Sequence, residues 1–312
     1  MSVARELANL VGTPTNGNIL LQSTAGDALD GTGTCNIAAG LNALGAATSG
    51  DDNIAIGRLA IGTGATTGTG NIGLGISALS ALIGGTNNIA MGLTAADAVT
   101  TGTDNIAIGR LAFSASSDGA DNIAIGRSAL AVSADDGDLN IAIGQAALGA
   151  GDVSGASNIA IGTTAMDALT TGLDNIAIGR NSLGAATTGE SNIAIGKNSF
   201  GTGAVVEGDE NIGIGSNVGD ALSTGACNIA IGLNAYGTAA AGANNIAFGN
   251  AAMGGSLVTG ADNIAIGRAT ADALLGGACN IALGHNALGC ATVGVKNIAL
   301  GLSAMGGVTT CL

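Results

Sequence analysis

Aromatic residues and proline are almost absent from this sequence. Its 312 residues include no Trp, one Tyr, three Phe and one Pro. Ordinary globular cores depend on large aromatic side chains for much of their buried area, which argues against a conventional core. Hydrophobic residues nonetheless make up 47% of the chain, a normal share for a folded protein and too high for a disordered Gly-rich one.

Positive charge is also scarce. The chain has 8 Lys and Arg against 22 Asp and Glu, giving a net charge of −14. This balance disfavours nucleic acid and anionic membrane surfaces, which both attract clustered bases. No apolar run reaches about 18 residues, so no membrane insertion is expected. The first residues carry Glu6 and Asn9 within their apolar stretch and do not resemble a secretory signal.

The five cysteines follow no metal or disulfide pattern. They stand far apart, without a Cys-x-x-Cys pair, at Cys35, Cys227, Cys279, Cys290 and Cys311. An odd, widely spaced set predicts free thiols, as in a protein assembled in a reducing cytoplasm.

What the sequence does contain is a repeat. The pentapeptide Asn-Ile-Ala-Ile-Gly, with small variations, occurs sixteen times, and its copies lie 17 to 19 residues apart. The Asn residues are at 36, 53, 71, 88, 105, 122, 140, 158, 175, 192, 211, 228, 245, 263, 280 and 297. A degenerate copy begins at Asn18. A fixed period of this length with high Gly content (56 residues) predicts a solenoid.

We number the repeat from its Asn, which is position 1. Position 2 is Ile in all sixteen copies, position 3 is Ala or Gly, position 4 is almost always a large apolar residue, and position 5 is always Gly. Alternate residues of a strand share a face. We therefore expect the Ile side chains of positions 2 and 4 in the core, and the Ala face of position 3 against a neighbouring chain.

A second apolar column occupies position 9, as at Leu44, Ile61 and Leu79, and a turn rich in Thr and Gly follows. We expect this column to fill the interior from the opposite wall. Phe113, Phe200 and Tyr236 belong to it, and Phe248 belongs to position 4, so all four aromatic side chains are predicted to be buried.

These columns predict an all-β fold, a parallel β-solenoid of about 17 coils of 17–19 residues over residues 18–312, stacked about 4.8 Å apart into a rod of about 80 Å. Residues 1–17 are predicted to form a short helix or arm that caps the solenoid. We expect a homotrimer with the Ala faces near its threefold axis.

Two sets of residues are assigned structural roles. Stacked Asn side chains are expected to form an amide ladder, and the invariant Gly is expected to turn a tight corner. The ladder includes Asn53, Asn105, Asn122, Asn175, Asn192 and Asn228. The corner glycines include Gly57, Gly109, Gly126, Gly179, Gly196 and Gly232.

The charged residues fall into two columns. Six of the eight bases stand at position 6, directly after the Gly: Arg58, Arg110, Arg127, Arg180, Lys197 and Arg268. Acids gather just before the Asn: Asp52, Asp104, Asp121, Asp174, Glu190, Glu210 and Asp262. They are interpreted as surface pairs between neighbouring coils or chains; the alternative is an exposed charged stripe that contacts a receptor.

Little else suggests chemistry. His285, the single His, shares position 6 with the bases and has no partner for a metal site or a catalytic triad. Asp135, Asp136 and Asp138 form a weak calcium candidate on a Gly-containing turn, without EF-hand spacing. No cofactor, no catalytic residue and no enzymatic activity are expected.

The repeat Asn-x-Ala-Ile-Gly-x-x-Ala-Leu, followed by Thr-Thr-Gly, resembles the shaft repeats of trimeric phage tail fibres. It is also similar to the head repeats of trimeric autotransporter adhesins, whose coils are shorter. The segment Ala4–Val11 resembles the opening of tail-fibre proteins. The resemblance implies a homotrimeric parallel β-solenoid used in host attachment, and the lack of a recognisable signal peptide and membrane anchor favours the phage family.

We therefore expect a structural tail-fibre component of a virion, a rigid shaft whose residues 1–17 contact tail or baseplate proteins and whose surface meets a host receptor. The alternative is an extracellular or cell-surface filament built of end-to-end solenoids, because open strand edges invite stacking.

Overall fold

A computed structural model describes residues 16–22, 24–29, 32–133, 137–201, 207–238 and 241–307. The chain divides into two compact units, Met1–Ala156 and Ser157–Leu312. The predicted N-terminal helix or arm lies almost entirely outside the described residues. Within them the structure contains strands and turns but no helix, and so none that is long and apolar enough to cross a membrane.

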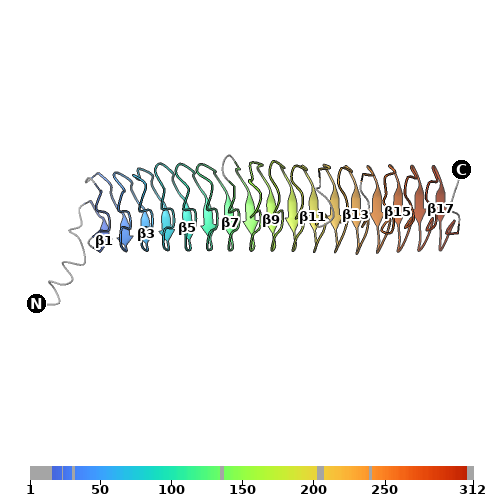
Figure 1. The fold of residues 1–312 in the computed structure, drawn as a ribbon, viewed down its shortest axis with the longest axis horizontal. Coiled ribbons are helices and arrows are strands. Elements are labelled where there is room, and N and C mark those ends of the chain that lie inside the picture. Colours follow the sequence, from blue (N-terminus) through green and yellow to red (C-terminus); the bar gives the residue numbers. More distant parts are fainter. Residues whose placement is uncertain are drawn as a thin grey trace, which may run out of the picture. The chain divides into compact units, whose positions relative to one another are not determined.

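The first unit is a stack of coils, each contributing one three-residue strand (Figure 1). Its strands are β1 (Ile19–Leu21), β2 (Ile37–Ala39), β3 (Ile54–Ile56), β4 (Ile72–Leu74), β5 (Ile89–Met91), β6 (Ile106–Ile108), β7 (Ile123–Ile125) and β8 (Ile141–Ile143). Each pairs in parallel with the next, residue for residue, so that Ile54 lies beside Ile72 and Ala55 beside Gly73.

The second unit repeats this arrangement. Its strands are β9 (Ile159–Ile161), β10 (Ile176–Ile178), β11 (Ile193–Ile195), β12 (Ile212–Ile214), β13 (Ile229–Ile231), β14 (Ile246–Phe248), β15 (Ile264–Ile266), β16 (Ile281–Leu283) and β17 (Ile298–Leu300). The 19-residue repeat between β11 and β12 keeps the same register, because its additional residues lie outside the strands. The predicted parallel β-solenoid is confirmed.

The assignment of the two strand faces was wrong. The Ala side chains of position 3 point inward and are 0–1% exposed, whereas the Ile side chains of positions 2 and 4 face outward and are half-buried to exposed. The small column does meet another backbone, but that backbone is the opposite wall of the same solenoid. A Cβ on Gly73 would lie 3.0 Å from Ile61 Cγ1 and 3.2 Å from the Ala78 carbonyl oxygen.

The core therefore lies between the Ala column and the opposite wall. Position 9 is buried as predicted, including Phe113, Phe200 and Tyr236, but Phe248 is 51% exposed because it belongs to the outward column. Residues of position 12, eleven after the Asn, form a third buried column that the sequence analysis missed. Its large members are Leu82, Val99, Leu169, Leu222 and Leu274.

The wall opposite the strands is built from left-handed residues. Position 9 has φ near +50°, even for the β-branched Ile61 (φ 46°) and for Phe113 (φ 51°). Such a conformation is unfavourable for bulky L-residues. Burial and a backbone bond to the next coil hold it, as where Leu79 N donates to the Ala95 carbonyl at 3.0 Å.

Candidate functional site

The Asn side chains form a continuous hydrogen-bonded column inside each unit. The Asn105 backbone N–H and side-chain amide both donate to Asn88 Oδ1, at 3.1 and 3.0 Å, and Asn105 Oδ1 accepts from the Asn122 N–H at 3.0 Å. The amide also donates to the Gly119 carbonyl, which belongs to the turn that closes the same coil. Asn105 thus ties its coil to two neighbours and fixes its own turn.

The same bonds recur at the other predicted ladder positions. Side-chain amides donate to turn carbonyls from Asn53, Asn122, Asn175 and Asn228, and the oxygen of the preceding Asn accepts from Asn53, Asn122, Asn175, Asn192 and Asn228. These side chains are 0–1% exposed. Because these side chains are buried and hydrogen-bonded within the solenoid, they are not available to a ligand.

The position 5 glycines stand where no side chain fits. Gly109 has φ +134°, and a Cβ built on it would lie 2.5 Å from the Gly126 carbonyl oxygen. The same close approach recurs at Gly57, Gly126, Gly179, Gly196 and Gly232. These residues therefore set the spacing of the coils at the corner.

The most extensive surface feature is the outward face of the strands, which we call the Ile face. It consists of the side chains at positions 2 and 4, and several of those at position 4 are markedly exposed, such as Ile56 (45%), Ile266 (41%) and Phe248 (51%). The face of a sheet that meets water is normally polar. Apolar columns repeated from coil to coil make a more extended exposed apolar surface than monomeric soluble proteins usually carry.

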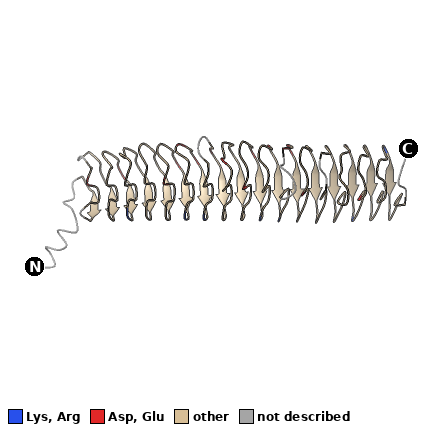
Figure 2. Cartoon of the chain, viewed as in Figure 1, with Lys and Arg blue, Asp and Glu red and all other residues tan. Residues whose placement is uncertain are grey.

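Charged columns border the Ile face on both sides. Position 0, directly before the Asn, lies at one end of each strand and position 6 lies past the corner at the other, so exposed Asp52 and exposed Arg58 flank the strand β3. Charged residues are sparse on the coils of either unit (Figure 2). Within the described residues, one side chain of the basic column forms a side-chain bond: Arg268 Nη2 lies 2.8 Å from His285 Nε2.

The acids at the next position outward behave differently. Asp51, Asp138 and Asp209 accept backbone N–H bonds at 2.7 to 2.8 Å from Thr34, Ala120 and Glu190 on the preceding coils. They are structural caps of the turns. Asp138 is thus engaged with backbone, while Asp135 and Asp136 of the calcium candidate lie outside the described residues.

Groups that could support catalysis do not converge in the part of the chain that the structure describes. No three His, Cys, Asp or Glu side chains there gather to hold a metal ion. Cys227 donates to Glu210 Oε2 at 3.4 Å, and this bond raises the thiol pKa, which works against nucleophilic activation. Partial burial raises the pKa of the Asp97 carboxyl, but no second catalytic group accompanies it.

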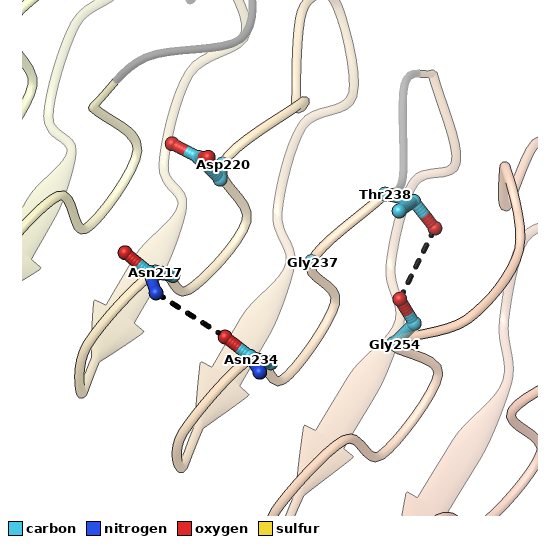
Figure 3. Close-up of a pocket in the computed structure, with 6 residues that line it drawn as sticks. All are labelled: Asn217, Asp220, Asn234, Gly237, Thr238 and Gly254. Atoms are coloured by element: carbon cyan, nitrogen blue, oxygen red, sulfur yellow. Dashed lines mark hydrogen bonds between the residues drawn. The ribbon is translucent and has the colours of Figure 1, made fainter.

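A polar hollow of about 380 Å³ lies on the second unit, on the wall away from the strands (Figure 3). It is lined by Asn217, Asp220, Asn234, Gly237, Thr238 and Gly254. Asn217 donates to Asn234 Oδ1 at 3.4 Å, and Thr238 Oγ1 donates to the Gly254 carbonyl at 3.2 Å. Its lining includes one titratable side chain, Asp220, and no large hydrophobic or aromatic side chain, unlike most ligand pockets.

Four of the cysteines lie within the described residues. Cys35, Cys227, Cys279 and Cys290 are exposed free thiols. Three of them stand at position 0, beside the Ile face.

No protein-family model matches the chain, and no curated protein matches it. The Ile face and its charged borders are therefore the features from which a function has to be argued.

Proposed function

We propose that this chain is a structural fibre protein, a phage tail-fibre-like shaft that holds a host-attachment surface away from a virion. The observation that carries the proposal is the Ile face, an apolar surface repeated coil after coil. Its even spacing suits a partner that repeats at the same spacing, and a further copy of the same chain has that property.

In this proposal the chains associate as a homotrimer through their Ile faces, in place of the Ala faces that the sequence had indicated. Burial of the Ile side chains would stabilise the trimer by about 25 cal/mol for each Å² of apolar surface removed from water. The assembly is a spacer and catalyses no reaction. It needs no cofactor, nucleic acid or membrane, in keeping with the net charge of −14.

The resemblance of the repeat to tail-fibre shafts supplies the attachment role, with residues 1–17 as the segment that would contact tail or baseplate proteins. The host receptor would contact the surfaces of the shaft that lie outside the associated Ile faces.

The second candidate is a surface or extracellular filament formed by end-to-end stacking. One observation favours it: successive coils pair through the same parallel, residue-for-residue register, as between β15 and β16 and between β16 and β17. A strand of a second copy could pair in the same way.

Mass photometry combined with negative-stain electron microscopy separates the two candidates. A particle of three chains, 29.2 kDa each, with uniform length supports the shaft. Fibres of indefinite length support the filament, and a soluble monomer at micromolar concentration contradicts both. Gold-labelled antibody against the chain should then decorate tails of the producing phage, and absence of tail labelling would contradict the virion location.

A further inference from the structure

Position 0 and position 6 are matched within each coil. Five of the sixteen coils carry Asp at position 0, and the same five carry Arg at position 6. They hold the pairs Asp52 and Arg58, Asp104 and Arg110, Asp121 and Arg127, Asp174 and Arg180, and Asp262 and Arg268. In the remaining copies Asp is absent from position 0 and Arg is absent from position 6.

The match is confined to these two positions and does not extend over the whole coil. Position 7 in the five coils is Leu59, Leu111, Ser128, Asn181 and Ala269. Position 9 is Ile61, Phe113, Leu130, Leu183 and Ala271. The match does not extend to other residue types, since of the three coils with Cys at position 0 two carry Leu at position 6 and the third, that of Cys279, carries His285. It is Asp at position 0 and Arg at position 6 that occur together.

Nothing within one chain explains this constraint. Six residues of extended chain separate the two positions, up to about 20 Å, and they lie at opposite ends of the strand. Arg58, Arg110, Arg127 and Arg180 make no side-chain bond in the described part of the chain, and of the five position 0 acids only Asp104 accepts one, from Asn87 at 3.0 Å.

Within one chain the charges are also stacked like on like. Strands β6 and β7 are neighbours, so Arg110 lies one coil from Arg127 and Asp104 one coil from Asp121. Side chains in one column are about 4.8 Å apart, and like charges in adjacent cross-strand positions are destabilising. An opposite charge on another molecule at the same height would offset this repulsion.

We propose that copies of this chain associate side by side, parallel and in register, with the position 0 Asp of one copy bonded to the position 6 Arg of the next copy in the same coil. This inference rests on the self-association proposed above and specifies its direction and register. Rotation about an axis along the stack brings the acidic border of one Ile face against the basic border of the next, at equal height.

The alternative orientations fail on charge. An antiparallel pair related by an axis along the strands sets basic border against basic border and acidic against acidic. A shift of one coil places Arg58 opposite Gly70 or Cys35 instead of an acid. Only the parallel, unshifted arrangement gives all five Arg an Asp, in both units of the chain.

The face is large enough for a stable contact. One coil offers about 4.8 Å by about 20 Å from border to border, or ~100 Å². The first unit, from β1 to β8, therefore presents ~800 Å², which equals the area that each partner buries in a standard protein interface.

A charge-exchange experiment on β6 and β7 tests the register. Reversing Arg110→Asp and Arg127→Asp sets acid against acid at the seam. The dissociation constant of the assembly, measured by sedimentation velocity, is expected to rise about tenfold or more, since like charges facing across an interface cost several kcal/mol. Circular dichroism should be unchanged, because neither Arg bonds within its own chain.

Rescue is then compared between two variants of equal net charge. Adding Asp104→Lys and Asp121→Lys restores opposite charges in the same coils and should return the constant to within about threefold of the original. Lys is suitable at position 0 because Lys296 already occupies it, at φ 58°. Adding Asp174→Lys and Asp262→Lys instead gives the same net charge in the wrong coils and should rescue nothing.

Equal rescue by both variants would show that only net charge matters and would overturn the register. No rescue by either would overturn the paired seam while leaving self-association in place. A wild-type chain that remains monomeric would overturn the seam together with the proposed fibre.

Discussion

The two faces of the strands in this solenoid differ in residue size, with small side chains facing inward and large apolar side chains facing outward. The inward face carries Asn and Ala, whose side chains are buried, and the Asn side chains are hydrogen-bonded. The outward face carries Ile, and it is the part left open to solvent. In most proteins the larger apolar side chain lies in the core. Here a coil of 17 residues leaves so narrow an interior that only the smallest side chains fit on the strand wall.

In the self-association that we propose, the two faces act at different levels: one within a chain and the other between chains. The inner face holds a single chain together through the Asn ladder and the close-packed Ala column. The outer face provides the apolar area and the bordering charges on which the proposed association depends. Substitutions on the inner face should therefore change the stability of one chain, whereas those on the outer face should change association.

The largest effect is expected at the corner between the faces. Gly109→Ala introduces a Cβ 2.5 Å from the Gly126 carbonyl oxygen at a φ of +134°. The free energy of unfolding in urea should fall by about 3 kcal/mol or more. Gly84→Ala is the matched control, since its nearest atom is Thr101 Cγ2 at 3.9 Å, and it should change stability by less than about 1 kcal/mol. Similar losses for both would contradict the corner role.

The next effect compares the faces directly on strand β6. Ala107→Leu adds volume to a fully buried site and should lower the free energy of unfolding by about 1–3 kcal/mol, at any protein concentration. The outward Ile108→Thr should cost the single chain less than about 1 kcal/mol, with a loss that grows as concentration rises, because it weakens association. Urea titrations at two concentrations measure both, and the opposite concentration dependence would reverse the assignment of the faces.

A smaller loss is expected from the Asn ladder. Asn245 donates from its amide to Tyr236 Oη at 2.8 Å and to the Gly260 carbonyl at 2.9 Å, and its Oδ1 accepts from the Asn263 N–H at 3.0 Å. Asn245→Ala leaves these buried groups unpaired and should lower the free energy of unfolding by about 1–3 kcal/mol. Asn250 is exposed in the same coil, and Asn250→Ala should change the free energy of unfolding by no more than about 0.5 kcal/mol. Equal effects would contradict the ladder.

The smallest effect depends on pH. Burial raises the pKa of the Tyr236 phenol, and the bond from Asn245 offsets this only in part. Because the pKa is higher in the folded state, the neutral phenol contributes to the free energy of unfolding in full below the unfolded pKa of about 10. This contribution is lost as pH rises above that value. Because this is the only Tyr, absorbance at 295 nm should rise only when the chain unfolds. Ionisation near pH 10 in the folded chain would contradict the burial, and Tyr236→Phe gives the baseline.

Much of the fold was predictable from the repeat. The period, the invariant Gly and the position 9 column were sufficient to predict a parallel solenoid and its register. Which face of each strand points inward was not predictable, because the alternation of residues shows which of them share a face but not which face lies inside. The size rule for cores suggested Ile inside, but the narrow interior at Gly73 and Gly213 reverses it, as a Cβ on Gly213 would meet the Phe200 ring at 2.7 Å.

The candidate site was only partly accessible from sequence. The charged columns were visible, but their position on either border of an apolar face required the structure. Left-handed residues such as Ile61 and Leu79 were also beyond prediction, since bulky residues seldom adopt this conformation. The buried column at position 12 could not be recognised in the sequence, because this position is Leu or Val in some coils and a small residue such as Ser or Ala in others.

The central claim is that the Ile face is covered by further copies of the chain. Its most direct test is the particle mass of the chain and of a variant with Ile106→Thr, Ile108→Thr, Ile123→Thr and Ile125→Thr, measured by mass photometry at equal concentration. We expect a closed assembly of several 29.2 kDa chains for the parent and a folded monomer for the variant. A monomeric parent, or a variant that assembles as the parent does, would contradict the claim.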